Sequence, residues 1–172
     1  MIVKIGEFTG SSITNFDMDN IFSSQFDVYD IKFNSVDLVD GTNSSWKMRF
    51  IDSAGSVVSG STYSSTGSMF RTDSDSWSYS NSQNDITYAN LGFRGGYSDD
   101  TEGMCSVTVF DPYNSSVYTT VYSEVSAWYS SGFVWIYKMA NVEKTQQAIR
   151  GVRFYGDSNF NSVSATVYGI EK

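Results

Sequence analysis

Apolar and polar residues alternate along several short segments of the chain. In residues 27–34, and again in 104–110, every second side chain is apolar and most of its neighbours are polar. The apolar members are Tyr29, Ile31 and Phe33 in the first segment and Cys105, Val107 and Val109 in the second. Because successive side chains of a strand point to opposite faces, this period of two predicts half-buried β-strands.

Further strands are expected wherever short apolar or aromatic runs lie between turn-forming residues. These runs are 46–50, 57–63, 77–79, 86–93, 117–129, 133–139, 149–155 and 163–170. The turn signal at 39–43 predicts that the strands before and after it pair as antiparallel neighbours. The turn-forming residues 156–161 predict that the last two runs form a closing hairpin.

The remaining segments predict loops rather than long helices. Residues 64–76 are rich in Ser, Thr, Gly and Asp and are expected to form a long loop. Residues 140–148 lack a sustained helical period and predict a turn of helix or a loop. Short strands without helical crossovers favour an all-β, antiparallel β-sandwich, jelly-roll-like, with long Ser/Asn/Gly-rich loops. An up-and-down barrel is the main alternative.

The chain divides into two parts on this interpretation. Residues 27–172 are expected to form the β-sandwich domain. Residues 1–26 are expected to form an N-terminal strand or arm that contacts other subunits, the alternative being an edge strand of the same sheet. No internal repeat of fixed period is present, which disfavours a propeller or solenoid.

The composition supports an all-β fold and limits the classes of partner that the chain can bind. Aromatic residues make up 16% of the chain, and a single cysteine excludes an intrachain disulfide. The first residues carry no signal-peptide pattern, and no apolar run reaches the length of a membrane-spanning helix, so a soluble protein is expected. Eleven basic against nineteen acidic residues give a net charge of −8. The negative electrostatic field of such a chain repels phosphate backbones and anionic lipids, which disfavours nucleic-acid and membrane partners.

Catalytic chemistry has little support in the sequence. The chain has no histidine, which excludes Ser-His-Asp and Cys-His nucleophilic systems and every metal site built on imidazole. Cys105 is expected to be a buried, inert thiol. Asp99, Asp100 and Glu102 share one loop, whereas glycosidase carboxylates face each other across about 5–9.5 Å, so solvated turn residues are favoured. We therefore expect a protein that is not an enzyme and needs no cofactor.

A spread carboxylate pair and a calcium site are the minor alternatives. A glycosidase pair could come from separate strands, with Asp30 or Glu124 as a member. Calcium could be held by two Asp-rich loops, although neither matches the full twelve-residue calcium motif. The candidate ligands are Asp73, Asp75, Asp99 and Asp100.

Aromatic side chains in Ser/Asn-rich segments are candidates for ligand contact. They are Tyr63, Trp77, Tyr79, Tyr97 and Tyr113. Such residues stack on sugar rings or anchor protein interfaces when exposed, and pack in the core when buried. The sequence leaves both alternatives open for each of them.

The two ends of the sandwich region resemble a known family. The C-terminal residues 149–160 (IRGVRFYGDSNF) and 165–170 (ATVYGI), with 26–33 (FDVYDIKF) and 46–50 (WKMRF), are similar to small β-sandwich virion proteins of tailed bacteriophages, especially marine ones. The resemblance covers about a third of the chain and marks strands rather than functional residues. It implies a jelly-roll-like domain on the virion surface.

That resemblance sets the functional expectation. It implies a head decoration or cement protein that binds the major capsid protein or other virion proteins, as a homo-oligomer located in the virion. The expected contact is the apolar material of the N-terminal segment, represented by Ile2, Ile5, Phe8, Phe16 and Phe22. A carbohydrate-binding tail-fibre or adhesin module, with a glycan as partner, is the alternative.

Overall fold

The computed structural model of the chain describes residues 1–39, 44–72, 78–94, 104–129 and 133–171. The described residues form ten strands and no helix. The strands are β1 (Ile2–Met18), β2 (Val28–Leu38), β3 (Ser44–Asp52), β4 (Tyr63–Arg71), β5 (Ser78–Ile86), β6 (Ala89–Arg94), β7 (Met104–Phe110), β8 (Thr119–Tyr129), β9 (Phe133–Glu143) and β10 (Ile149–Ile170). Neighbouring strands pair antiparallel, which confirms the predicted all-β, jelly-roll-like sandwich.

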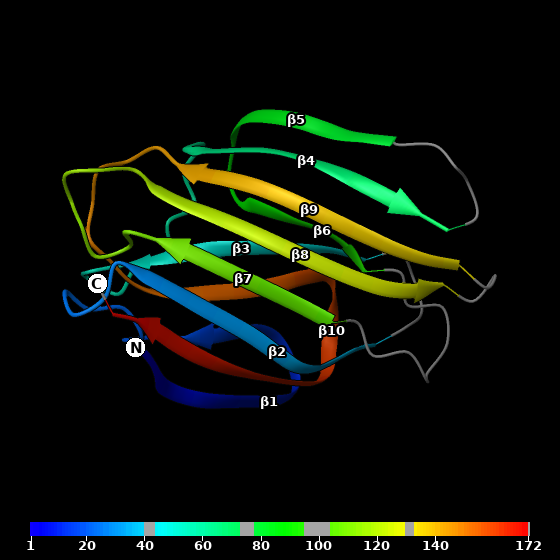
Figure 1. Ribbon diagram of the computed structural model, residues 1–172, viewed down its shortest axis with the longest axis horizontal. Helices are drawn as coiled ribbons and strands as arrows, with labels where there is room; N and C mark the ends of the chain where they lie inside the picture. The colour runs from blue at the N-terminus through cyan, green and yellow to red at the C-terminus, as the bar shows by residue number, and fades with distance from the viewer. Residues whose placement is uncertain (40–43, 73–77, 95–103, 130–132, 172) are drawn as a thin grey trace.

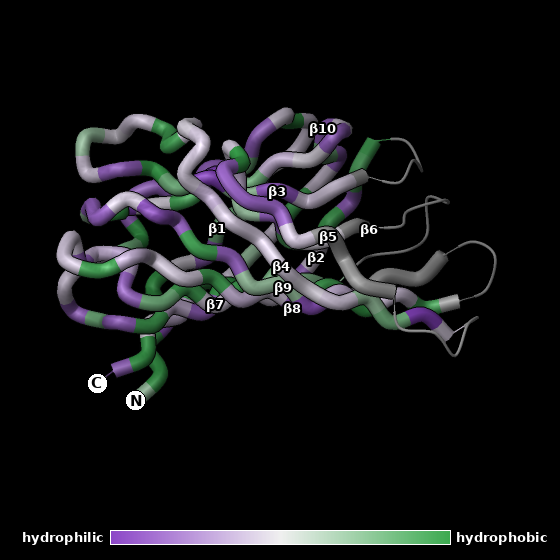
Figure 2. Tube along the Cα trace, turned by 90° about the horizontal axis from the view of Figure 1, so that it is seen from above, coloured by the Kyte–Doolittle hydropathy of each residue, from purple (hydrophilic) through white to green (hydrophobic). Residues whose placement is uncertain are grey.

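One long strand joins the two layers of the sandwich. The strand order is β5-β4-β9-β8-β7-β2-β10-β3-β6, with β1 also paired to β10. Residues 160–170 of β10 pair with β2, whereas residues 149–155 pair with β3. The sheet therefore folds over at β10 into a large layer (β5, β4, β9, β8, β7, β2 and residues 160–170) and a small layer (residues 149–155, β3 and β6). In Figure 1 β2, β7, β8 and β9 of the large layer lie in front, and in Figure 2 β3 of the small layer lies on the opposite side from β7 and β8.

Aromatic side chains fill the space between the layers. Phe33 of β2 meets both Trp46 of β3 and Phe154 of β10 edge-on, with ring centroids 4.9 Å apart in each pair. Near the other end of β3, Phe50 stacks on Tyr63 of β4 at 6.2 Å. Edge-to-face and offset pairs are favourable ring geometries, so these aromatic residues hold the two layers of the core together.

The connection from β1 to β2 is anchored by an arginine. The Arg150 guanidinium donates to both carboxylate oxygens of Asp19, at 2.8 and 2.5 Å. The Phe22 amide donates to the Arg150 carbonyl at 3.0 Å. The hydrogen bond from Arg150 lowers the pKa of Asp19 below its usual range. Two bonds from one planar group fix the path of the chain as it leaves β1.

The Asp19–Arg150 pair predicts a specific dependence of stability on pH. Because the pKa of Asp19 is lower in the folded chain than in the unfolded chain, its stabilisation is present above the ordinary carboxyl pKa. That stabilisation is lost as the pH falls through the folded pKa. Asp19→Asn is therefore expected to lower the free energy of unfolding at neutral pH and to approach the wild type at an acidic pH below the folded pKa of Asp19.

Urea denaturation at the two pH values measures this difference. Asp37→Asn on β2 is the matched control, because no ion pair of Asp37 is present among the described residues. It should differ little from the wild type at either pH. An Asp19→Asn deficit of equal size at both values would mean that the carboxylate charge contributes nothing.

The expected closing hairpin is wrong. Residues 156–161 continue β10 without a turn, because neighbouring strands satisfy their polar groups. The Ser45 amide and the Lys47 ammonium donate to the Asp157 carboxylate, and the Val39 amide donates to the Asn159 carbonyl at 2.8 Å. The segment that looks like a turn in the sequence is the point where β10 passes from one layer to the other.

Two further predictions, the pairing around residues 39–43 and the loop at residues 64–76, also differ from the structure. The strands before and after the 39–43 turn signal are not neighbours, because β10 lies between β2 and β3. Residues 64–71, expected in a long loop, belong to β4, where hydroxyl side chains occupy both faces. Ser65 faces inward and is buried, and its hydroxyl donates to Asn141 of β9. Because this inward position is polar, the sequence of β4 lacks the apolar alternation that predicts a strand.

The N-terminal residues form part of the same sandwich. β1 lies at the edge of the sheet and follows β10 through both layers, with bulges between Lys4 and Gly6 and between Ile13 and Asn15. The edge-strand alternative therefore describes residues 2–18. The following connection contributes Phe22 and Phe26 to the core.

Candidate functional site

The outer face of the large layer points away from the core and spans several strands of the sheet. Its side chains form rows across the strands, because paired residues of neighbouring strands share a face. The row nearest the termini contains Ile2, Ile170, Val28 and Phe110, each paired with the next. All four are apolar, and Ile2 is 69% exposed. An apolar row on the solvent side of a sheet is not explained by core packing.

The connection between β7 and β8 adds to this row. It follows Phe110 and is held against the start of β10, where the Ile149 amide donates to the Pro112 carbonyl at 2.8 Å. It carries three exposed apolar side chains at the same end of the molecule: Tyr113, Val117 and Tyr118. The two chain ends are adjacent there, since the Glu171 amide donates to the Met1 carbonyl (Figures 1 and 2). We call Ile2, Val28, Phe110, Tyr113, Val117, Tyr118 and Ile170 the terminal patch.

The next row on the outer face mixes aromatic and polar groups. Tyr168, Asp30, Thr108 and Tyr122 follow one another across four strands. The Thr108 hydroxyl donates to the Asp30 carboxylate at 2.6 Å. Tyr122 is 40% exposed, so part of its ring faces solvent.

The third row carries charges of both signs. Lys32, Ser106, Glu124 and Lys138 are paired in that order from β2 to β9. The Lys138 ammonium lies 3.2 Å from the Glu124 carboxylate, and the Lys32 ammonium lies 3.4 Å from the carboxylate of Asp30. Two cations and two anions therefore lie within this part of the face, and their charges cancel.

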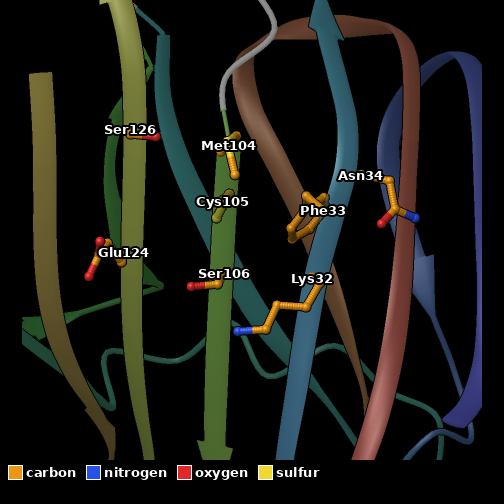
Figure 3. A pocket seen from close by; sticks show the side chains of 8 residues that line it. All are labelled: Lys32, Phe33, Asn34, Met104, Cys105, Ser106, Glu124 and Ser126. Carbon is orange, nitrogen blue, oxygen red and sulfur yellow. The ribbon is translucent and has the colours of Figure 1, made fainter. Parts of the chain in front are cut away.

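A hollow of about 800 Å³ opens over this charged row. Its polar lining comes from β2, β7 and β8, and Figure 3 shows the Lys32 ammonium directed towards Ser106. The lining residues are Lys32, Phe33, Asn34, Met104, Cys105, Ser106, Glu124 and Ser126. The size lies in the range of small-ligand sites. We call this feature the polar hollow.

The residues around the polar hollow do not form an activated nucleophile. Cys105 lies at its base and is 7% exposed, and burial raises the pKa of its thiol well above neutral. The thiol therefore stays protonated and weakly nucleophilic at neutral pH. Asp30 accepts from Thr108 and Glu124 pairs with Lys138, so both carboxylates mentioned as glycosidase candidates already have partners.

The aromatic candidates from the sequence separate into different environments. Tyr63 is a core residue rather than a loop residue, because its hydroxyl donates to the Val58 carbonyl and accepts from the Phe50 amide, both at 3.0 Å. Tyr113 is exposed and belongs to the terminal patch. Tyr79 lies in β5. Trp77 and Tyr97 lie outside the described residues.

The N-terminal residues that were predicted to contact other subunits also differ in their exposure. Ile2 and Ile5 are exposed, and Ile5 lies in the first bulge of β1. Phe8 is half-buried and packs against the core. Phe16 and Phe22 are each 3% exposed, so the expectation that they contact other subunits is corrected. They close the core instead, with Phe22 4.7 Å from the Tyr29 ring.

The proposed calcium ligands Asp73, Asp75, Asp99 and Asp100 lie outside the described residues. Within the ranges that the structure does describe, no three side chains of the metal-binding types come together. Over the same ranges, no helix is long and apolar enough to cross a membrane.

Sequence reasoning missed most of the surface residues described here. Lys32 and Ser106 alternate with core residues and look like ordinary solvent-facing positions, and Glu124 is considered only as a possible glycosidase carboxylate. Their pairing across three strands depends on the register, which the sequence does not specify. Phe110 was detectable in principle, because it is an aromatic residue on the polar side of an otherwise regular alternation.

Comparison with known proteins leaves the function open. No family model and no curated protein matches the chain. The marine PL-14 alginate lyase of Aplysia kurodai is similar at 12% identity and a TM-score of 0.36, covering 88% of this chain and 72% of that one. An alginate lyase from Alteromonas sp. 272 is 9% identical with a TM-score of 0.29, covering 92% and 76%. The CBM2 module of an evolved Dit of Lactobacillus casei BL23 phage J-1 is 9% identical with a TM-score of 0.25, covering 92% and 70%. Likenesses this distant carry no argument about activity or ligand.

Proposed function

We propose that this chain is a non-enzymatic structural protein of a phage virion, a decoration or cement protein that binds the head surface. The terminal patch is the observation that carries this proposal. It combines a row of paired apolar side chains from β1, β10, β2 and β7 with the exposed apolar side chains of the β7–β8 connection that follows Phe110. The partner is the major capsid protein or another virion protein, as the family resemblance implies.

The composition of the terminal patch is that of a protein interface. The centres of such interfaces are enriched in aromatic residues and depleted of charge, and a few large side chains carry most of the binding energy. Phe110, Tyr113 and Tyr118 supply those large groups, and Ile2, Val28 and Ile170 supply aliphatic surface between β1 and β7. Docking this surface on a partner removes apolar area from water.

Among the residues that the structure describes, the candidate nucleophile and the candidate acids are not activated, which supports a non-enzymatic role. The chain has no histidine, and Cys105 is a buried thiol whose pKa is raised. Asp30 and Glu124 each hold a partner on the sheet. A binding function needs none of this chemistry.

Sedimentation with particles tests the docking role. The mass of the purified chain in solution gives its oligomeric state, for which we expect a homo-oligomer. The chain is then added to phage heads that lack it, and the pellet is expected to contain it at a saturating, symmetric stoichiometry. A chain that stays in the supernatant but binds host cells would favour the alternative, a carbohydrate-binding tail-fibre or adhesin module.

A matched pair of variants locates the contact. Phe110 and Met104 lie at opposite ends of β7 on the same exposed face. Phe110→Ser is expected to weaken sedimentation about tenfold or more, because it removes a large anchor from the terminal patch. Met104→Ser, with melting curves to confirm folding of both, should leave it unchanged. Equal sedimentation of Phe110→Ser and the wild type would contradict docking through this patch.

A further inference from the structure

The polar hollow holds hydrogen-bonding groups that the fold itself does not use. Within the described residues, the hydroxyls of Ser106 and Ser126 have no hydrogen-bond partner. The Asn34 amide donates to Thr166 at 3.0 Å, which leaves its carbonyl oxygen as a free acceptor. The Lys32 ammonium has three donors and one long contact, at 3.4 Å, to Asp30. These groups are therefore available to a ligand.

The pattern of donors and acceptors fits a ligand rich in hydroxyl groups. Lys32 only donates, the Glu124 carboxylate only accepts, and Ser106 between them does both. A sugar hydroxyl can donate and accept at once, so adjacent hydroxyls can bridge this row. Neighbouring strands are about 4.8 Å apart, which places the three groups at intervals comparable to one sugar unit.

Charge balance selects among such ligands. Lys32 and Lys138 are offset by Asp30 and Glu124, so the hollow has no excess positive charge to hold an anion. The chain as a whole carries a net charge of −8. An acidic polysaccharide would be repelled, whereas a neutral one can gain charge-assisted hydrogen bonds from both signs.

Apolar surface borders the hydrogen-bonding groups. Met104 at the rim is 73% exposed, and Tyr122 lies two residues from Glu124 on the same face of β8. The rise of a strand places the tyrosine about 7 Å from the carboxylate position. An exposed ring beside polar groups can stack on the apolar face of a pyranose.

We propose that the polar hollow is a binding site for a neutral saccharide. Lys32, Ser106 and Glu124 hydrogen-bond its hydroxyls, and Tyr122 stacks on a neighbouring sugar ring. The site shares no residue with the terminal patch, so a decoration protein docked through that patch would still present it. Failure of either proposal leaves the other intact.

Calorimetric titration of the full chain tests the site. The probes are cellohexaose, laminarihexaose, maltohexaose and mannohexaose, with hexagalacturonate as the anionic comparison. At least one neutral probe is expected to bind saturably, and hexagalacturonate is expected to bind more weakly. Binding of no neutral probe, or tighter binding of hexagalacturonate, would overturn the proposal.

Three variants place the ligand. Ser106→Tyr places a bulky ring in the middle of the charged row, and Glu124→Gln keeps the shape of the side chain while removing its charge. Each is expected to weaken binding about tenfold, Ser106→Tyr because its ring occupies the space of the ligand and Glu124→Gln because the charged acceptor of a hydrogen bond is lost. Ser11→Tyr makes the same change as the first variant at an exposed position of β1 and should bind as the wild type. Unchanged binding by both hollow variants would overturn this location, and sedimentation of Ser106→Tyr with phage heads should remain unaffected.

Discussion

Replacing Phe154 with alanine is expected to lower the free energy of unfolding by about 3–5 kcal/mol. Phe154 has no exposed surface, and it lies in the part of β10 that belongs to the small layer. Its ring meets Phe33 from the large layer at 4.9 Å and Trp46 from β3 at 6.4 Å. Removing it leaves a cavity between the layers and also removes the aromatic pairs that join them.

Equilibrium denaturation in urea measures this loss. Tyr122→Ala is the matched control, since it removes an aromatic ring of similar size from a half-exposed position on the outer face. Surface substitutions of this kind usually change stability by about 0.5 kcal/mol or less. If Phe154→Ala proved as mild as Tyr122→Ala, the two layers would not depend on this cluster for their cohesion.

The inward faces of the strands could be predicted from the sequence, because burial imposes a period of two. Tyr29, Ile31 and Phe33 alternate with polar residues, and all three are buried. Cys105 and Val107 on β7 follow the same pattern. Where both faces of a strand carry hydroxyls, as in β4, the period disappears and the strand resembles a loop.

The path of β10 could not be predicted in the same way. Its residues 156–161 have the composition of a turn, and what keeps them extended is contact with strands far away in the sequence. The Ser45 amide donates to Asp157 at 2.9 Å across more than a hundred residues of chain. Such tertiary hydrogen bonds outweigh the local turn propensity of these residues. The predicted hairpin and the predicted pairing of β2 with β3 therefore do not form.

The candidate site depends on the same long-range information. Lys32, Ser106 and Glu124 come from three separate strands, and only the register of β2, β7 and β8 brings them together. A shift of one residue would turn each of them to the opposite face. The lack of histidine and the burial of the Cys105 thiol could be predicted from the sequence, whereas the polar hollow could not.

Gly151→Ala is expected to lower the free energy of unfolding by about 1–3 kcal/mol, although it adds only a methyl group. A Cβ at this position would lie 2.5 Å from the Met18 carbonyl oxygen and 2.8 Å from the Asp19 Cα. Both atoms belong to the backbone, so no side-chain rotation relieves the contact. The end of β1 must move away from β10, which strains the Asp19–Arg150 pair and the bond from the Phe22 amide to the Arg150 carbonyl.

Gly60→Ala separates this steric effect from the general cost of replacing glycine. At Gly60 the nearest atom to an added Cβ is the Thr62 methyl at 3.6 Å, an ordinary contact. Its stability should change by about 0.5 kcal/mol or less. In Gly151→Ala, hydrogen exchange at the Phe22 amide should also accelerate, because its bond to Arg150 is the first that the displaced segment loses. Wild-type stability together with wild-type exchange in Gly151→Ala would show that β1 does not depend on close approach to β10 at this point.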